Sequence, residues 1–155
     1  MTTKRRELER RVTTQIVRLA RVYRREVDRA LQGYGISDAQ AVPVLHIARC
    51  GGGIRQHLLA EEIGIEGPSL VRLLDQLCGN GLVERRDDWH DRRAKTLHLT
   101  AAGEVLAARV EEVLTRLRET LLAPVGDADV AAAARVLDVL DAGLAELGNA
   151  AKGER

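Results

Sequence analysis

The segment IRQHLLAEEIGIEGPSLVRLLDQLCGNG, residues 54–81, predicts two short helices joined by a tight turn. The turn is GIEG, residues 64–67, and Pro68 follows it in the first turn of the second helix, where a missing N–H costs no hydrogen bond. Gly79-Asn80-Gly81 ends that helix. Two helices of about nine and about twelve residues around a short turn that contains glycine are typical of a helix-turn-helix.

The second of these helices has an apolar side and a polar side. The side chains expected to face the core are Leu58, Leu59 and Ile63 in the first helix and Val71, Leu74, Leu77 and Cys78 in the second. Ser69, Arg72 and Gln76 lie on another side of the second helix. In a major groove arginine pairs with guanine, glutamine with adenine, and serine with a base or a phosphate. Most surface helices have a polar outer face, so this trio indicates DNA recognition only through its place in the motif.

The hydrophobic period changes after this helix. Leu82-Val83 begins a strand, and KTLHLT, residues 95–100, alternates polar and apolar side chains. RRDDWHDRRA, residues 85–94, lies between them as a polar tip. A hairpin directly after a helix-turn-helix is a wing, and Thr100 is placed to cap the helix that follows.

The wing is charged but nearly balanced. Residues 82–100 contain five basic and four acidic residues, and in isolation such a segment would be interpreted as a solvated hairpin. Asp91 and Arg93 are two positions apart and lie on the same side of an extended backbone. An aspartate paired with one arginine holds the loop and leaves the other free to enter a minor groove, where the potential is most negative. The stretch therefore predicts that a few positively charged side chains are held in position to contact DNA, rather than a broad basic patch.

Long amphipathic helices are expected at both ends of the chain. Their apolar stripes are Leu8, Val12, Ile16, Leu19, Tyr23, Val27 and Ala30; Val105, Leu106, Val110, Val113, Leu117 and Leu121; and Val130, Ala133, Leu137, Leu140, Leu144 and Leu147. Gly33 and Gly35 end the first helix. Pro124 and Gly126 separate the other two, and Gly148-Asn149 is predicted to end the last. Such stripes must be buried, and a second copy of the chain is the simplest partner.

The composition is that of a soluble globular protein, with 45% apolar and 30% charged residues in a chain of 155. We find no apolar run long enough for a membrane span and no secretory signal in the basic MTTKRRELERR, so we expect a cytoplasmic protein. The net charge is only +1 but uneven: residues 1–30 hold ten basic and four acidic residues, and residues 101–155 hold six and ten. DNA binding must therefore be inferred from motif geometry rather than from overall charge.

The reactive side chains predict no enzyme. Cys50 and Cys78 form no CxxC motif, and we identify no cysteine or histidine at ligand spacing beside them, so free thiols are expected and a redox switch is the alternative. The histidines, whose spacing supports no metal cluster, are His46, His57, His90 and His98. No catalytic triad, phosphate loop or pair of carboxylates is evident. We therefore expect neither a cofactor nor a metal.

GIEGPSLVRLLDQLCGNGLVERR, residues 64–86, followed by DRRAKTLHLTAAG, residues 91–103, resembles the recognition helix, wing and following helix start of the MarR family, and more narrowly its SlyA-like branch. The family's D-x-R and LTxxG elements are present as Asp91-Arg92-Arg93 and as Leu99 to Gly103. The helix layout extends the resemblance over roughly residues 8–148, while the motifs themselves lie within 54–103.

The resemblance implies a homodimeric winged helix-turn-helix transcription regulator, often a repressor, that binds pseudo-palindromic operators. It implies a dimer interface made by the N- and C-terminal helices. Many members release DNA when small aromatic or phenolic compounds bind in a pocket between the dimerisation and DNA-binding regions. Others sense oxidants through a cysteine near the N-terminus, where this chain has none.

We therefore expect a mainly α protein with a small β-wing that binds double-stranded DNA as a homodimer, responds to a small aromatic or phenolic effector and has no membrane partner. The expected parts are an N-terminal dimerisation helix (1–34), a winged helix-turn-helix domain (35–103), C-terminal dimerisation helices (104–148) and a flexible tail (149–155). The expected DNA contacts are Pro68, Ser69, Arg72 and Gln76 in the recognition helix and Arg85, Arg86, Asp91, Arg92, Arg93 and Lys95 in the wing.

Two alternatives remain open at this stage: a winged-helix adaptor that binds protein instead of DNA, and a small-molecule-binding protein without a DNA function. Three features also depart from the family pattern. Gly51-Gly52-Gly53 is richer in glycine than expected and would loosen the lead into the motif. Cys78-Gly79 replaces a charged pair and would weaken the helix end by up to about 1 kcal/mol. Trp89-His90 belongs to no family motif and has no assigned role.

Overall fold

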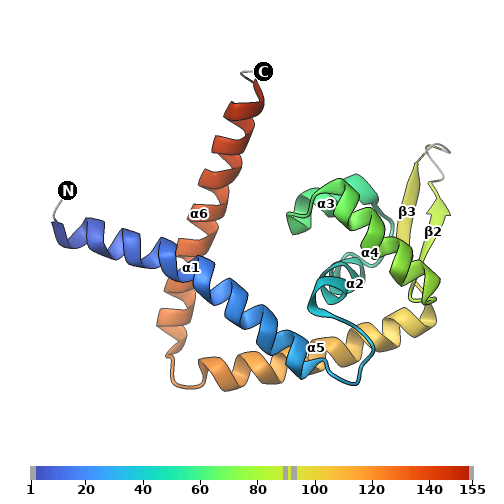
Figure 1. Cartoon of the computed structure of the whole chain (residues 1–155), viewed down its shortest axis with the longest axis horizontal. Helices are drawn as coiled ribbons and strands as arrows, with labels where there is room; N and C mark the ends of the chain where they lie inside the picture. Colours follow the sequence, from blue (N-terminus) through green and yellow to red (C-terminus); the bar gives the residue numbers. More distant parts are fainter. Residues whose placement is uncertain (1–2, 89–90, 92–93, 154–155) are drawn as a thin grey trace. The chain divides into compact units, whose positions relative to one another are not determined.

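The structure, a computed structural model, describes residues 3–88, 91 and 94–153 (Figure 1). Its elements are α1 (Thr3–Ala30), α2 (Asp38–Arg49), β1 (Ile54–Arg55), α3 (Gln56–Ile63), α4 (Gly67–Gly79), β2 (Val83–Asp87), β3 (Lys95–Leu99), α5 (Ala101–Leu122) and α6 (Asp127–Gly153). The three strands form one antiparallel sheet in the order β1-β3-β2. The predicted fold class, mainly helical with a helix-turn-helix followed by a β-wing, is confirmed. No helix in the described part of the chain is long and apolar enough to cross a membrane.

The chain divides into two compact units, residues 1–117 and 118–155. The first contains α1 to β3 and most of α5, and therefore the whole winged helix-turn-helix. The second contains the end of α5 and α6. The first turn of α6 contains Asp127 and Asp129, whose negative charges suit the positive N-terminal end of the helix dipole. α6 continues to Gly153, so the helix end predicted at Gly148-Asn149 was wrong.

The start of α2 is fixed by a side-chain cap at Ser37. The Ser37 side chain accepts a hydrogen bond from the Gln40 N–H at 3.4 Å, and the Gln40 side chain accepts one from the Ser37 N–H at 3.2 Å. This reciprocal pair is a capping box, which satisfies two backbone donors that the helix itself leaves without partners.

The end of α2 is fixed by three consecutive glycines. Gly51, Gly52 and Gly53 have φ angles of 71°, 80° and 79°, a left-handed conformation that side chains disfavour. The N–H of Gly53 donates to the Leu97 carbonyl at 2.9 Å, which joins the turn to β3. A Cβ atom on Gly52 would lie 2.8 Å from Nδ1 of His98. The glycines therefore form a left-handed turn that a hydrogen bond joins to β3, and the expectation that they loosen this segment stays a prediction.

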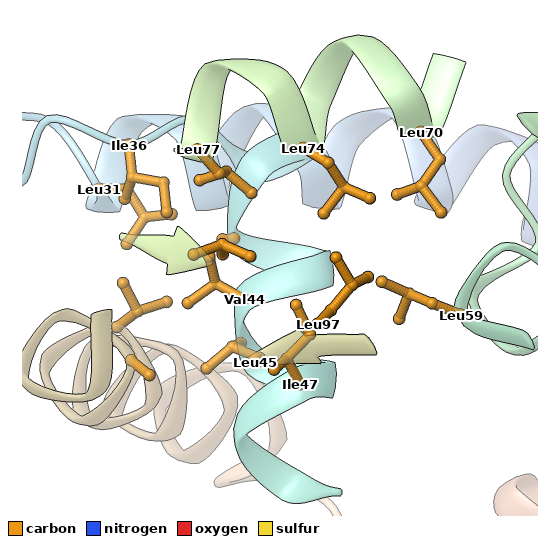
Figure 2. Packing of buried hydrophobic residues seen from close by; sticks show 14 of the residues in the cluster. Leu31, Ile36, Val44, Leu45, Ile47, Leu59, Leu70, Leu74, Leu77 and Leu97 are labelled. Carbon is orange, nitrogen blue, oxygen red and sulfur yellow. The ribbon is translucent and has the colours of Figure 1, made fainter. Parts of the chain in front are cut away.

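The core of the first unit lies between α4, α2, α3 and β3. Figure 2 shows Leu70, Leu74 and Leu77 pointing from one side of α4 toward the side on which Val44, Leu97 and Leu59 lie. All three leucines of α4 are fully buried, as are Ile47, Leu59 and Leu97. Two inward assignments from the sequence were wrong, because Leu58 and Val71 are exposed. In α4 the buried residue is Leu70 instead of Val71, the next residue along the chain. Cys78 is only partly buried.

The sheet places the wing against this core. Val83 pairs with Leu99 and Arg85 with Leu97 in the β2–β3 hairpin, while Ile54 of β1 pairs with Leu97 on the other side of β3. The prediction that Ile54 and Arg55 belong to a helix was wrong, since they form β1, and a two-residue strand has no measurable period.

The LTxxG element joins the wing to α5. The Thr100 side chain accepts the N–H of Gly103 at 3.0 Å, which confirms it as the cap, and its hydroxyl donates to the Gly81 carbonyl at 2.6 Å. A Cβ atom on Gly103 would lie 2.0 Å from the carbonyl oxygen of Leu82. The glycine of this motif is thus required because helix and strand backbone come into direct contact.

Candidate nucleic-acid interface

The helix-turn-helix consists of α3, a short turn and α4. Gly64 ends α3 in the left-handed conformation, with a φ of 65°. Ser69 donates its backbone N–H to the Glu66 carbonyl at 3.0 Å and so begins the hydrogen bonding of α4. Pro68 lies in the first turn of α4, where the sequence placed it.

The outer face of α4 carries the three side chains expected to read bases. Ser69, Arg72 and Gln76 are all exposed, while the opposite side of the helix packs into the core. Arg72 forms no ion pair with any residue that the structure describes. Gln76 accepts a hydrogen bond at 3.1 Å from the side chain of Gln40, at the start of α2. The face thus presents an unpaired guanidinium between a hydroxyl and an anchored amide.

The described cations of the wing are each held by a carboxylate. Arg85 contacts Asp75 of α4 at 2.7 Å, which ties the wing to the recognition helix. Arg86 pairs with Glu84 on its own strand, and Lys95 pairs with the carboxylate of Asp87 across the hairpin. These ion pairs are largely exposed, so each is worth less than about 1 kcal/mol and can be exchanged for a phosphate.

The base of the wing is braced by an ion pair that the sequence analysis missed. Asp88 is the one buried charged side chain among the described residues, and it accepts hydrogen bonds from Nε and Nη2 of Arg55 at 2.8 and 2.7 Å. Arg55 belongs to β1, 33 positions earlier in the chain. Asp91, the residue predicted to hold the tip, is exposed, and its backbone carbonyl accepts the Ala94 N–H at 2.8 Å. No local pattern links Arg55 to Asp88, and only the sheet brings them together.

Four residues of the predicted tip lie outside the described part of the chain. They are Trp89, His90, Arg92 and Arg93. The contact of Arg92 or Arg93 with a minor groove therefore stays a prediction.

A pocket of about 560 Å³ lies beside the wing, between the end of α2, the glycine turn, β3 and α5. Leu45, Ile47, Leu99 and Ala107 contribute its apolar surface. Its charged rim includes Arg49, which pairs with Glu111 of α5 at 2.8 Å, and Arg86.

Two titratable groups near the interface have shifted pKa values. Burial lowers the pKa of His98, a pocket residue, below its usual 6.5; the Arg86 cation adds to this and Glu84 opposes it. The imidazole is therefore neutral at pH 7 and acts there as a hydrogen-bonding group. Burial raises the pKa of the Cys78 thiol, with Arg85 opposing the shift. Because the thiolate is the reactive form, this environment does not favour a redox switch at Cys78.

Comparison with known proteins agrees with this geometry. The family model described as MarR family matches residues 39–95. The crystal structure of the transcriptional regulator PA3341 is 36% identical, with a TM-score of 0.80, over 87% of this chain and 98% of that one. The transcriptional repressor CouR, bound to a 23-mer DNA duplex, is 26% identical, with a TM-score of 0.76, over 87% of this chain and 95% of that one. The transcriptional regulator SlyA is 16% identical, with a TM-score of 0.80, over 87% of this chain and 94% of that one.

These similarities place the protein in a class, the winged helix-turn-helix regulators of transcription. The protein belongs to the MarR family within that class, and it is a DNA-binding transcriptional regulator. The similarity to SlyA, at 16% identity, shows the shared fold alone, and membership of the narrower SlyA-like branch stays a prediction.

Proposed function

We propose that the protein is a homodimeric repressor that binds a pseudo-palindromic operator and is released by a small aromatic acid. The observation that carries this proposal is the outer face of α4, where Arg72 is exposed without an ion pair in the described structure. An arginine in this position on the helix after the turn is free to form two hydrogen bonds with a guanine. The relative CouR, whose structure is that of a repressor on DNA, supports the same role.

Different side chains would contact the bases and the phosphates of the DNA. Ser69, Arg72 and Gln76 would contact base edges, with Pro68 setting the entry of the helix into the groove. The phosphate contacts would come from Arg85, Arg86 and Lys95, which would exchange their carboxylate partners for the DNA backbone. Asp91 would hold the shape of the tip while Arg92 or Arg93 enters the minor groove.

The terminal helices support a dimer. Much of the apolar stripe of α1 is exposed in the single chain, including Leu8, Ile16 and Leu19. α6 likewise exposes Leu144 and Leu147. Burying these side chains against a second copy would place two recognition helices one helical turn of DNA apart, about 34 Å.

The pocket supports release by an effector. Its apolar surface suits an aromatic ring, and Arg49 and Arg86 suit a carboxylate. A ligand that takes the Arg49 guanidinium competes with Glu111, and one that takes Arg86 acts directly on the wing. We therefore expect binding of a small aromatic acid, such as salicylate, to weaken DNA binding.

The test is a fluorescence-anisotropy titration of the DNA upstream of the protein's own gene against random DNA of equal length. Arg72→Ala should reduce the preference for the operator by roughly 1–3 kcal/mol, and Arg86→Ala should weaken binding to both sequences similarly. Affinity should fall steeply with salt and with added salicylate. Equal losses for both variants would refute the role assignment. Absence of binding at low salt would refute the regulator and favour a protein-binding adaptor.

A further inference from the structure

Three side chains with different donor atoms meet where the end of α2 packs on α3. They are the imidazole of His46, the thiol of Cys50 and the carboxylate of Glu62. One nitrogen, one sulfur and one oxygen donor lie within 4.8 Å of one another. None of the three has a place in the proposed DNA contacts.

The backbone holds these donors in place. His46 and Cys50 are one helical turn apart, and the Cys50 N–H donates to the His46 carbonyl at 3.0 Å. The three left-handed glycines that follow fix this helix end. Glu62 comes from α3, and its carboxylate already contacts Nε2 of His46. Two of the three donors are therefore in contact without any ion.

All three side chains are accessible from solvent. Cys50 is exposed, and the side chains of His46 and Glu62 are 25% and 51% exposed. The neighbouring cation Arg49 is engaged with Glu111 of α5 at 2.8 Å. An ion can thus reach the group, and the carboxylate and thiolate would supply two negative charges to balance it.

We propose that His46, Cys50 and Glu62 bind a Zn²⁺ ion, with water as the fourth ligand. A set of one nitrogen, one sulfur and one oxygen donor suits Zn²⁺, whereas Mg²⁺ and Ca²⁺ take oxygen ligands. Tetrahedral zinc with bonds of about 2.0–2.3 Å needs its donors roughly 3.3–3.8 Å apart, which rotation of these side chains can achieve. On binding, the Cys50 thiol loses its proton to solvent, and neutral His46 coordinates through a ring nitrogen.

The ion would join two elements of the DNA-binding unit. His46 and Cys50 belong to α2 and its cap, while Glu62 lies near the end of α3, the first helix of the helix-turn-helix. Because the ion binds the folded arrangement and not the separated helices, Zn²⁺ should raise the thermal midpoint of unfolding, and EDTA should reverse the rise.

The expectation that no metal is bound did not take account of two features. His46 lies four positions before Cys50, a spacing that places both on one face of a helix. Glu62 is twelve positions further on and joins them only because α3 packs against α2.

The test uses Co²⁺ as a spectroscopic probe on the reduced full-length protein. One equivalent per chain should give a thiolate-to-cobalt charge-transfer band in the near ultraviolet, and Zn²⁺ should displace it. Cys50→Ser should abolish the band. Cys78→Ser, the matched control at the other cysteine, should retain it. His46→Ala and Glu62→Gln should each weaken Zn²⁺ binding by at least about tenfold, the loss that removal of even an outer partner of a zinc ligand causes.

Other outcomes would overturn the proposal. These are absence of the band in the wild-type protein, its survival in Cys50→Ser, or its loss in the correctly folded Cys78→Ser variant. A stoichiometry of one ion per two chains would place the metal between copies instead. Circular dichroism of each variant tests folding, and Glu62→Gln keeps the size of the side chain in case His46→Ala fails to fold. None of these readouts requires DNA, so failure of the metal site and failure of the proposed repressor function are distinguishable.

Discussion

The core of the winged helix and the last helix of the chain are both rich in leucine and valine, but they differ in what covers those side chains. Leu70, Leu74 and Leu77 of α4 are 0% exposed within one chain. Leu144 and Leu147 of α6 are 67% and 70% exposed. The first region completes its core alone, while the second has an apolar face that a single chain does not cover. The following predictions test this difference.

The largest effect is expected where the winged helix is packed most tightly. Gly103→Ala should destabilise the protein by about 3–5 kcal/mol, because the new methyl group would lie 2.0 Å from the Leu82 carbonyl oxygen. The backbone holds both groups, so neither can move away by rotating a side chain. Chemical denaturation measures the loss. Gly79→Ala is the matched control, since its methyl group meets nothing within 4 Å, and it should be neutral or stabilising. Similar stabilities for the two variants would show that the junction of β2 and α5 is loosely packed.

A smaller effect, confined to assembly, is expected in the terminal helix. Leu144→Ala should weaken a dimer by roughly 2 kcal/mol, or about 30-fold in the dissociation constant, while changing the isolated chain little. Analytical ultracentrifugation over a range of concentrations measures this. Arg135→Ala, an exposed polar position on the same helix, provides the comparison. A dimer constant unchanged by Leu144→Ala would remove this part of α6 from the interface.

The brace of the wing should contribute less to stability than the core. Arg55→Ala leaves the buried Asp88 carboxylate without this partner and should cost about 1–2 kcal/mol, since Arg55 is itself partly exposed. Arg86→Ala removes an exposed ion pair on the same hairpin and should cost less than about 1 kcal/mol. Urea denaturation compares them. If Arg86→Ala proved the more destabilising, Arg55 and Asp88 would not be the main support of the wing.

The smallest effect concerns pH. Because burial holds the pKa of His98 below 6.5, the unfolded chain binds this proton more readily than the folded one. The contribution of the neutral His98 side chain to the free energy of unfolding is complete above pH 6.5. It is lost as the pH falls through the lower pKa of the folded state. His98→Gln should therefore reduce the loss of stability between about pH 7.5 and about pH 5.5. His57→Gln, at an exposed position of α3, is the control, and an equal reduction in both variants would contradict the assignment.

The features that the sequence predicted correctly are local ones. The cap at Thr100 and the turn around Gly64 depend on residues a few positions apart. Assignment of the core faces was less accurate. Leu58 and Leu59 are adjacent, and which of them faces inward depends on the neighbouring helices rather than on the helix itself.

The contacts that the sequence did not reveal join distant positions. Arg55 and Asp88 are 33 residues apart, and Gln40 and Gln76 are 36 apart. Neither pair produces a periodic signal, because each depends on how the sheet and the helices pack. Ser69 and Arg72 are exposed on α4, as the sequence predicted, and their contacts with DNA remain predictions.

The carboxylate partners of Arg85, Arg86 and Lys95 also affect how the protein would search a chromosome. Non-specific DNA attracts a regulator mainly through its phosphates. In the proposed complex each of these cations would first leave Asp75, Glu84 or Asp87, which would lower the gain from phosphate contacts on any sequence. The base contacts proposed for Arg72 would then supply a larger share of the binding free energy on an operator. Because a genome offers about 10⁶–10⁹ competing sites, weaker phosphate contacts would shorten the time that the protein spends at each wrong site.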